Sequence, residues 1–245
     1  MKIIKADNYQ TWYLEYFKKG ILIDPWLTNK LQPDGSFFIQ RSKLNTSCLS
    51  QELVERVNAI IITAPFEDHL HVDTLKMLPN DITIYTSKFV KPYLLKNNIN
   101  NQIKILSEEG TIINSLIVKS LPTSYPYFKS TFSILFEDKN KNKIFHEGHR
   151  VNFKYIAKHK IKANVAILTA EETKLFGLIQ LGMSYKKSLK AAELLESDKL
   201  FITGNSPDQT KGFISNFLYT KPFNLDALSK KLDVYFAEGD SFSFR

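Results

Sequence analysis

The feature of this 245-residue sequence that most restricts its fold is an unbroken apolar run at 59–63, which reads Ala-Ile-Ile-Ile-Thr. β-Branched residues favour a strand, and a strand without polar interruptions needs cover on both of its faces. A segment containing Glu67, Asp68, His69 and His71 follows directly. We therefore expect a strand in the interior of a layered protein, ending at a loop rich in titratable side chains.

Segments with the pattern of strands and of helices alternate along the rest of the chain in two similar halves. Neither half has enough apolar strands for a core of its own, so we expect one domain over residues 1–245. Two sheets packed face to face, with helices outside, would make a four-layer αββα sandwich of the α/β (α+β) class. The expected helices are 51–57, 72–78, 89–96, 151–159, 186–195 and 225–232, and the expected strands are 10–17, 21–24, 59–63, 82–86, 103–106, 111–121, 131–137, 144–145, 165–169, 200–203 and 234–237.

Composition restricts the partners and the location of the protein. The net charge is +8, but the lysines are scattered, which indicates a solvated surface and no nucleic-acid partner. A single cysteine, Cys48, leaves no disulfide framework and no thiolate zinc site. Residues 1–7 lack the core of a signal peptide, and no apolar run approaches the length of a membrane span. We expect a cytoplasmic protein that acts on a small molecule and does not associate with a membrane.

Four of the five histidines lie in two short segments, each of which follows a predicted strand. The first segment contains His69 and His71, and the second contains His146, Glu147 and His149. Imidazole and carboxylate groups on loops anchored by strand ends are suitable ligands for Zn, Mn or Fe. The spacing predicts that these segments form the functional site, but by itself it does not separate a metal site from two polar loops.

Two stretches carry a resemblance to a known family: residues 21–27, I-L-I-D-P-W-L, and residues 61–69, I-I-T-A-P-F-E-D-H. They resemble the metallo-β-lactamase superfamily, in particular its ascorbate-6-phosphate lactonase-like branch and the uncharacterised cyanobacterial and plant members with an E-D-H-x-H motif. Residues 143–149 fall where the family has a glycine and an acid at a strand end. Residues 184–195, S-Y-K-K-S-L-K-A-A-E-L-L, resemble a helix of that branch. The resemblance spans nearly the whole chain and implies the αββα fold.

The same resemblance implies that the first metal site of the family is absent. The family motif T-H-x-H-x-D-H is here T-A-P-F-E-D-H, so that Ala64 and Phe66 replace two histidines. The strand end at 121–124, where the third ligand of that site is expected, has no histidine. At the second site Asp68 and His69 remain, which leaves at most a mononuclear site.

One interpretation of the remaining residues is a hydrolase with one metal ion at the second site. Imidazole and carboxylate ligands without thiolate favour Zn, Mn or Fe. A metal-bound water, with its pKa lowered towards about 7, would attack a small ester, lactone or phosphoester while a carboxylate takes its proton. The metal-ligand candidates are Asp68, His69, His71 and His149, and the catalytic candidates are Asp68, Glu67 and Glu147.

The other interpretation is a catalytically inactive protein that binds a metabolite or RNA in the cleft without a metal ion. His149 stands where the family has its metal-bridging aspartate, and Gly204 or Asn205 stands where it has its last histidine. In this case His69 would be a relic that hydrogen-bonds to Thr63 or Asp24. Under either interpretation we expect Asp24 to orient the loop after 59–63, and the loops 28–50 and 174–184 to set specificity.

Overall fold

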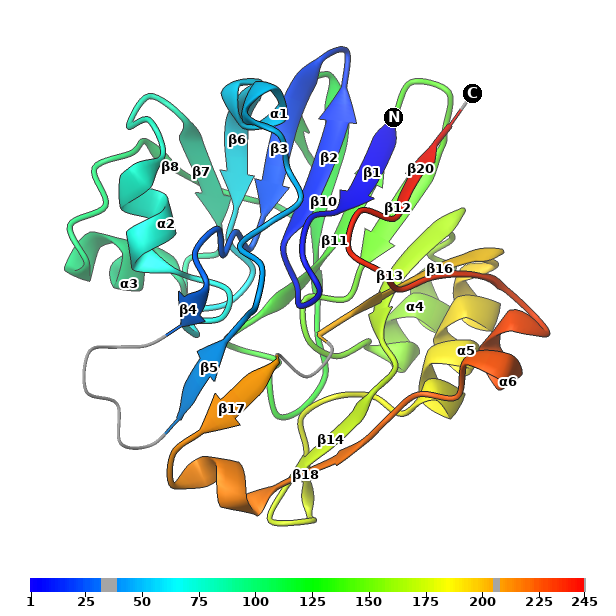
Figure 1. Cartoon of the computed structure of the whole chain (residues 1–245). Coiled ribbons are helices and arrows are strands. Elements are labelled where there is room, and N and C mark those ends of the chain that lie inside the picture. The colour runs from blue at the N-terminus through cyan, green and yellow to red at the C-terminus, as the bar shows by residue number, and fades with distance from the viewer. Residues whose placement is uncertain (32–38, 205–207, 245) are drawn as a thin grey trace.

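A computed structural model, which describes residues 1–31, 39–204 and 208–244, shows two seven-stranded sheets that face each other (Figure 1). The first sheet runs in the order β20 (Ser241–Ser243), β1 (Lys2–Lys5), β2 (Trp12–Tyr16), β3 (Lys19–Ile23), β6 (Val57–Ile61), β7 (Thr83–Thr86) and β8 (Ile103–Ile105). The second sheet runs in the order β19 (Asp233–Tyr235), β16 (Lys199–Thr203), β13 (Val165–Thr169), β12 (Lys143–His146), β11 (Phe132–Glu137), β10 (Leu116–Pro122) and β9 (Thr111–Ile113).

Helices cover the outer face of each sheet, which makes four layers. Three of them lie on the first sheet, namely α1 (Gln51–Glu55), α2 (Val72–Met77) and α3 (Lys91–Lys96). The other three lie on the second sheet, namely α4 (Phe153–His159), α5 (Tyr185–Leu195) and α6 (Leu225–Ser229). A third cluster of buried residues, including Ile61 and Ile134, fills the space between the sheets. The expected αββα architecture is confirmed.

The strand predicted from the run at 59–63 is β6, and it lies in the interior of the first sheet. It pairs in parallel with β3 on one side and with β7 on the other. Ile60 faces the helices and Ile61 faces the second sheet, and both are fully buried. The strand ends at the loop that carries Asp68 and His69. The apolar run thus reflects burial on both faces of the sheet, as predicted.

Some predicted elements differ from the observed ones at turns. Residues 111–121 form a hairpin of β9 and β10 instead of one strand. Its two turn residues, Asn114 and Ser115, have φ angles of 51° and 66°, which belong to the left-handed region of a tight hairpin turn. An Asn-Ser pair lacks the glycine that usually marks such a turn. The longest helix, α5, has 11 residues, and in the described ranges no helix has the length and apolar content to cross a bilayer.

Two three-stranded sheets lie at one end of the sandwich (Figure 1). One consists of β17 (Gln209–Lys211), β5 (Gln40–Ser42) and β4 (Lys30–Leu31). The other consists of β15 (Ile179–Gln180), β14 (Glu172–Leu175) and β18 (Leu218–Lys221), and the short helix η1 (Ile214–Phe217) precedes β18. The segments expected as loops at 28–50 and 174–184 therefore contain strands, each sheet being completed by a segment after residue 208. Because these strands pair with segments far away in the sequence, no local sequence pattern predicts them.

Candidate active site

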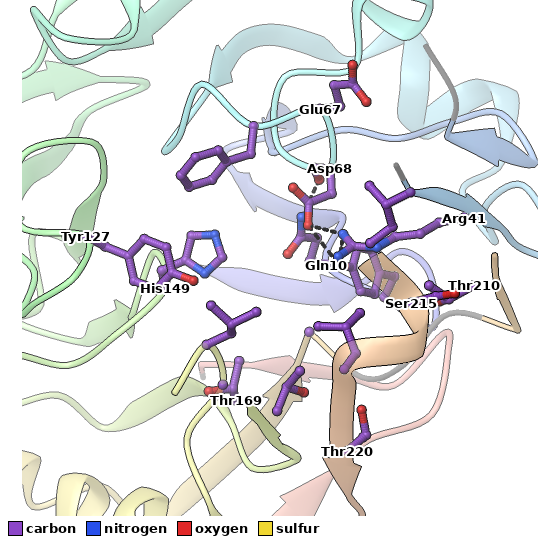
Figure 2. A pocket seen from close by; sticks show the side chains of 18 of the residues that line it. Gln10, Arg41, Glu67, Asp68, Tyr127, His149, Thr169, Thr210, Ser215 and Thr220 are labelled. Carbon is purple, nitrogen blue, oxygen red and sulfur yellow. Dashed lines mark hydrogen bonds and ion pairs between the residues drawn. The ribbon is translucent and has the colours of Figure 1, made fainter. Parts of the chain in front are cut away.

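A pocket of about 950 Å³ opens between the strand ends of the sandwich and the two small sheets (Figure 2). Both predicted site segments reach it, the first with Glu67 and Asp68 and the second with His149. The small sheets contribute Arg41 from β5, which lies next to Asp68, and Thr210 from β17, on the side of the pocket away from His149 (Figure 2). The pocket thus lies where the sequence places the functional site, and much of its outer wall comes from segments predicted as loops.

Asp24 holds His69 in one orientation beneath this pocket. Asp24 follows β3, is fully buried, and adopts a φ of 46°, a left-handed conformation that aspartate tolerates better than most residues. Its Oδ1 accepts a hydrogen bond from the Thr63 amide at 2.7 Å. Its Oδ2 lies 2.7 Å from Nδ1 of His69 and also accepts from the Thr63 hydroxyl. Because a carboxylate can only accept, Nδ1 of His69 carries the proton and Nε2 points away. Asp24 orients the loop, as expected.

His149 faces His69 from the second sheet, with the two Nε2 atoms 2.8 Å apart. A short turn through Gly148 brings it there from β12, and Gly148 has a φ of 70° with no room for a side chain. Since Nδ1 of His69 donates to Asp24, Nε2 of neutral His69 accepts a hydrogen bond from Nε2–H of His149. Nδ1 of His149 is then the unprotonated nitrogen, and no hydrogen bond within the described chain engages it.

The two imidazoles differ in their affinity for a proton. Burial lowers the pKa of His69, but the charge and the hydrogen bond of Asp24 outweigh it, and the net pKa is raised above the ordinary value. Burial, reinforced by the neighbouring His69, lowers the pKa of His149 to about 3. An additional proton on the pair therefore resides on His69, beside the buried carboxylate.

Asp68 interacts with Arg41 and Tyr9. Its Oδ2 lies 2.5 Å from Nη1 of Arg41 and accepts a hydrogen bond from the Tyr9 hydroxyl at 2.8 Å. That hydroxyl in turn accepts from the same Nη1 at 2.7 Å, and the Gln10 amide donates to the backbone oxygen of Asp68. Burial alone would raise the pKa of Asp68, but Arg41 and the imidazoles hold it well below the ordinary carboxyl value. Asp68 is therefore ionised at neutral pH and paired with the Arg41 guanidinium, which does not deprotonate in proteins.

Three residues that bind Asp68 lie outside the predicted site: Arg41, Tyr9 and Gln10. Arg41 lies in a segment interpreted as an irregular loop, and it reaches Asp68 only because β5 pairs with β17. The sequence offers one signal for them, the carboxylate of Asp68 among the candidate site residues, because a carboxylate that becomes buried needs a cation or several hydrogen-bond donors. That requirement names the type of partner but not its position in the chain.

The structure places the other predicted site residues away from the imidazole pair. His71 is the N-cap of α2, where Nδ1 accepts from the Thr74 amide at 3.2 Å, and it is not part of the pocket wall. Glu67 lies exposed on that wall. Glu147 is buried outside it, with neither carboxyl oxygen in a hydrogen bond to a described residue. Burial raises the pKa of Glu147 to about 8, so at neutral pH it is mostly protonated and a poor base.

Neither a protein-family model nor a curated protein matches the sequence. Solved structures match it over the full length. An isothiocyanate hydrolase from Delia radicum gut bacteria is 20% identical, with a TM-score of 0.77 and coverage of 100% of this chain and 99% of that one. A possible metal-dependent hydrolase from Veillonella parvula is 16% identical, with a TM-score of 0.78 and the same coverage. The metallo-β-lactamase fold protein YhfI from Bacillus subtilis is 10% identical, with a TM-score of 0.68 over 99% of both chains.

This chain has the metallo-β-lactamase fold. At sequence identities of 10–20%, the structural similarity establishes the fold alone. The chemistry depends on the residues at the site of this chain. The stretch at 61–69, which resembles the family in sequence, forms the end of β6 and the loop at the pocket. The sequence motif therefore lies at the pocket.

Apolar side chains occupy the part of the metallo-β-lactamase fold in which the resemblance places the first metal site. Ala64 is fully buried, and the ring of Phe66 lies 5.5 Å from that of His149 and 6.0 Å from that of Tyr127. Tyr127 stacks on His149 with ring centroids 4.3 Å apart. At the position of the last family histidine, Gly204 lines the pocket, while Asn205 lies outside the described residues.

The donors at the second site do not fit a metal ion in this arrangement. Across residues 1–31, 39–204 and 208–244, no three His, Cys, Asp or Glu side chains are grouped so that they could hold one. Two nitrogens bound to one tetrahedral zinc ion would lie roughly 3.3 Å apart, whereas the Nε2 atoms of His69 and His149 are at the hydrogen-bonding distance of 2.8 Å. The third expected donor, Asp68, is paired with Arg41. In this arrangement the described residues therefore do not form a metal site.

Proposed function

We propose that this metallo-β-lactamase-fold protein hydrolyses a small ester, lactone or phosphoester by acid–base chemistry at His149, His69 and Asp24. The observation that carries the proposal is a continuous chain of hydrogen bonds from the pocket to a buried carboxylate. It runs from His149 to His69 over 2.8 Å and from His69 to Asp24 over 2.7 Å. A base oriented by a buried carboxylate is the arrangement that acid–base catalysts on unrelated folds share.

In the proposed reaction a water molecule in the pocket loses a proton to Nδ1 of His149. Its oxygen attacks the carbonyl carbon or the phosphorus of the substrate. His149 releases its Nε2 proton to Nε2 of His69, and the resulting imidazolium is stabilised by Asp24. When the bond to the leaving oxygen breaks, that oxygen takes the proton back from Nδ1 of His149, while the proton on His69 returns to Nε2 of His149. One water is consumed; an ester or phosphoester gives an acid and an alcohol, and a lactone gives a single hydroxy acid.

The two other sequence-based candidates predict different behaviour. In a mononuclear metal hydrolase, chelation would abolish turnover and one equivalent of Zn²⁺, Mn²⁺ or Fe²⁺ would restore it. In an inactive protein, the pocket would bind a metabolite or RNA without turnover; a small-molecule ligand is favoured by its volume of about 950 Å³. The substrate is the only partner we propose, and a cytoplasmic location remains a prediction from the sequence.

The proposal is tested with chelator-treated protein of measured metal content, assayed against p-nitrophenyl acetate, γ-butyrolactone and p-nitrophenyl phosphate. We expect turnover of at least one compound to survive chelation. His149→Gln should lower kcat by a factor of about 10² to 10⁴, the usual contribution of general acid–base catalysis. His159→Gln, a change of an exposed histidine on α4, is the matched control and should retain full activity. Loss of all turnover on chelation, or no turnover of any compound by the wild type, would contradict the proposal.

A further inference from the structure

The small sheet of β14, β15 and β18 extends from the pocket away from the sandwich (Figure 1). Its first strand, β14, begins shortly after β13 ends at Thr169, and Thr169 lines the pocket. Figure 2 shows Thr169 and Thr220, a residue of β18, on the side of the pocket away from Glu67. The sheet therefore forms a wall of the pocket and continues outwards from it.

One face of this sheet carries no charge. Residues paired across two antiparallel strands share a face, and successive residues alternate between faces. Thr173 pairs with Thr220 and Leu175 with Leu218, so these four share a face, and all but Leu175 line the pocket. We call this the inner face. The outer face holds the other residues of the two strands, including every charged one: Glu172, Lys174, Tyr219 and Lys221.

The inner face becomes more apolar with distance from the sandwich. The threonine pair is nearer to β13, and the pair of Leu175 and Leu218 follows two residues further, a distance of about 7 Å. Ile179 of β15 pairs with Leu175, which places it on the same face, and it is 44% exposed. At the outer end of the sheet Phe176 and Phe217 have rings 4.9 Å apart and are also exposed. A contiguous apolar surface beside a pocket is typical of a ligand-binding groove.

We infer that the substrate is a carboxylic ester or lactone with an apolar chain, and that this chain lies along the inner face of β14 and β18. The inference rests on the proposed hydrolysis, because it places the reacting carbonyl group near His149. An apolar chain gains free energy by leaving water, whereas a charged chain would meet no opposite charge on this face. The inner face is continuous with the pocket through Leu218 and Thr220, which favours the substrate as its occupant over a second copy of the protein.

Turnover of two esters that differ only in the length of the acyl chain tests the inference. Chelator-treated wild type is assayed with p-nitrophenyl acetate and p-nitrophenyl hexanoate. Each methylene group that leaves water strengthens binding about fourfold, so on this partly open face kcat/KM should be at least about 10-fold higher for the hexanoate. Leu175→Thr/Leu218→Thr retains residues that suit a strand and should lose most of this preference. Tyr219→Thr, on the outer face of β18, is the matched control and should keep it.

Binding of ketones gives a readout that needs no turnover. 2-Heptanone carries the apolar chain of the hexanoate beside a carbonyl group, acetone carries that of the acetate, and neither can be hydrolysed. Ligand-observed NMR titrations should show that the wild type and Tyr219→Thr bind 2-heptanone at least about 10-fold more tightly than acetone. Leu175→Thr/Leu218→Thr should lose most of that difference.

Equal kcat/KM for the two esters in the wild type would overturn this inference and leave the proposed hydrolysis in place. An equal loss of preference in Tyr219→Thr would also overturn it. So would a wild-type dimer in analytical ultracentrifugation that Leu175→Thr/Leu218→Thr dissociates, because a second copy would then occupy the inner face. Binding of 2-heptanone that the double variant loses, without turnover of any ester, would support the apolar ligand and contradict the hydrolysis alone.

Discussion

The Nε2 atoms of His69 and His149 lie 2.8 Å apart, although the two residues are separated by 80 positions in the sequence. Each follows a strand of a different sheet, so the pair exists only because the sheets pack face to face. At that distance one nitrogen has to donate and the other has to accept. Asp24 decides which, because it accepts the hydrogen bond from Nδ1–H of His69 and so leaves Nε2 of His69 as the acceptor.

Replacing Asp24 by asparagine should shift the pH profile of turnover. The proposed base works only while His69 is neutral, so activity falls as the pH drops through the pKa of His69, which Asp24 raises. Asp24→Asn removes that charge, and the acidic limb of kcat/KM should move to lower pH. The maximum value of kcat/KM should also fall, because His69 loses the carboxylate that orients its ring. Asp226→Asn, a change in α6 away from the pocket, serves as the control. An unchanged acidic limb in Asp24→Asn would argue against the relay.

Replacing His71 by alanine should reduce stability without reducing turnover. His71 caps α2 by accepting from the Thr74 amide, and loss of an N-cap costs about 0.5–2 kcal/mol. Asn152→Ala, which removes the equivalent bond to the Tyr155 amide at the start of α4, should cost a similar amount. Urea unfolding and kcat are measured for both variants. A loss of kcat in His71→Ala at unchanged stability would contradict this prediction and would indicate that His71 takes part in the functional site.

Replacing Glu147 by glutamine should flatten the dependence of stability on pH. Burial raises the folded-state pKa of Glu147 to about 8 from its ordinary value of 4.5. Between these values the folded protein keeps a proton that the unfolded chain releases, so stability falls as the pH rises, by up to about 1.4 kcal/mol per pH unit. The stabilisation is complete below pH 4.5 and is lost as the pH passes 8. Glu147→Gln does not titrate. The free energy of unfolding is measured with urea between pH 5 and 8 for the wild type, Glu147→Gln and the control Glu52→Gln in α1. The slope of this free energy against pH should be smaller for Glu147→Gln, whereas the slope for Glu52→Gln should match that of the wild type.

Replacing Gly148 by alanine should cost more stability than the same change at Gly177. Both glycines have a left-handed φ, 70° and 68° respectively, where an added Cβ costs about 1–2 kcal/mol. At Gly148 the Cβ would also collide with the backbone oxygen of Phe132, whereas at Gly177 nothing lies within 4 Å. We expect a further loss of about 1–3 kcal/mol at Gly148, together with a displaced His149. Equal losses of Tm in the two variants would show that the backbone relaxes without strain.

The sequence by itself determined the layers of this protein and the approximate place of its site. The β-branched run at 59–63 predicted a strand covered on both faces, because unbroken apolar side chains would otherwise remain in water on one side. Strand and helix periods arise from backbone geometry within a few residues, so the order of the elements was readable locally. The polar segments with Asp68, His69 and His149 follow those strands directly, which located the site at the strand ends.

Only the tertiary structure decided what those residues do. Arg41 reaches Asp68 through the pairing of β5 with β17, two segments far apart in the chain, and no local pattern encodes that pairing. His71 caps a helix although it lies two positions from His69, because the loop turns its side chain towards α2. The roles of the site residues depend on distances between side chains from different sheets. Those distances are set by packing across the whole molecule, whereas the pattern of apolar residues reports only which faces are buried.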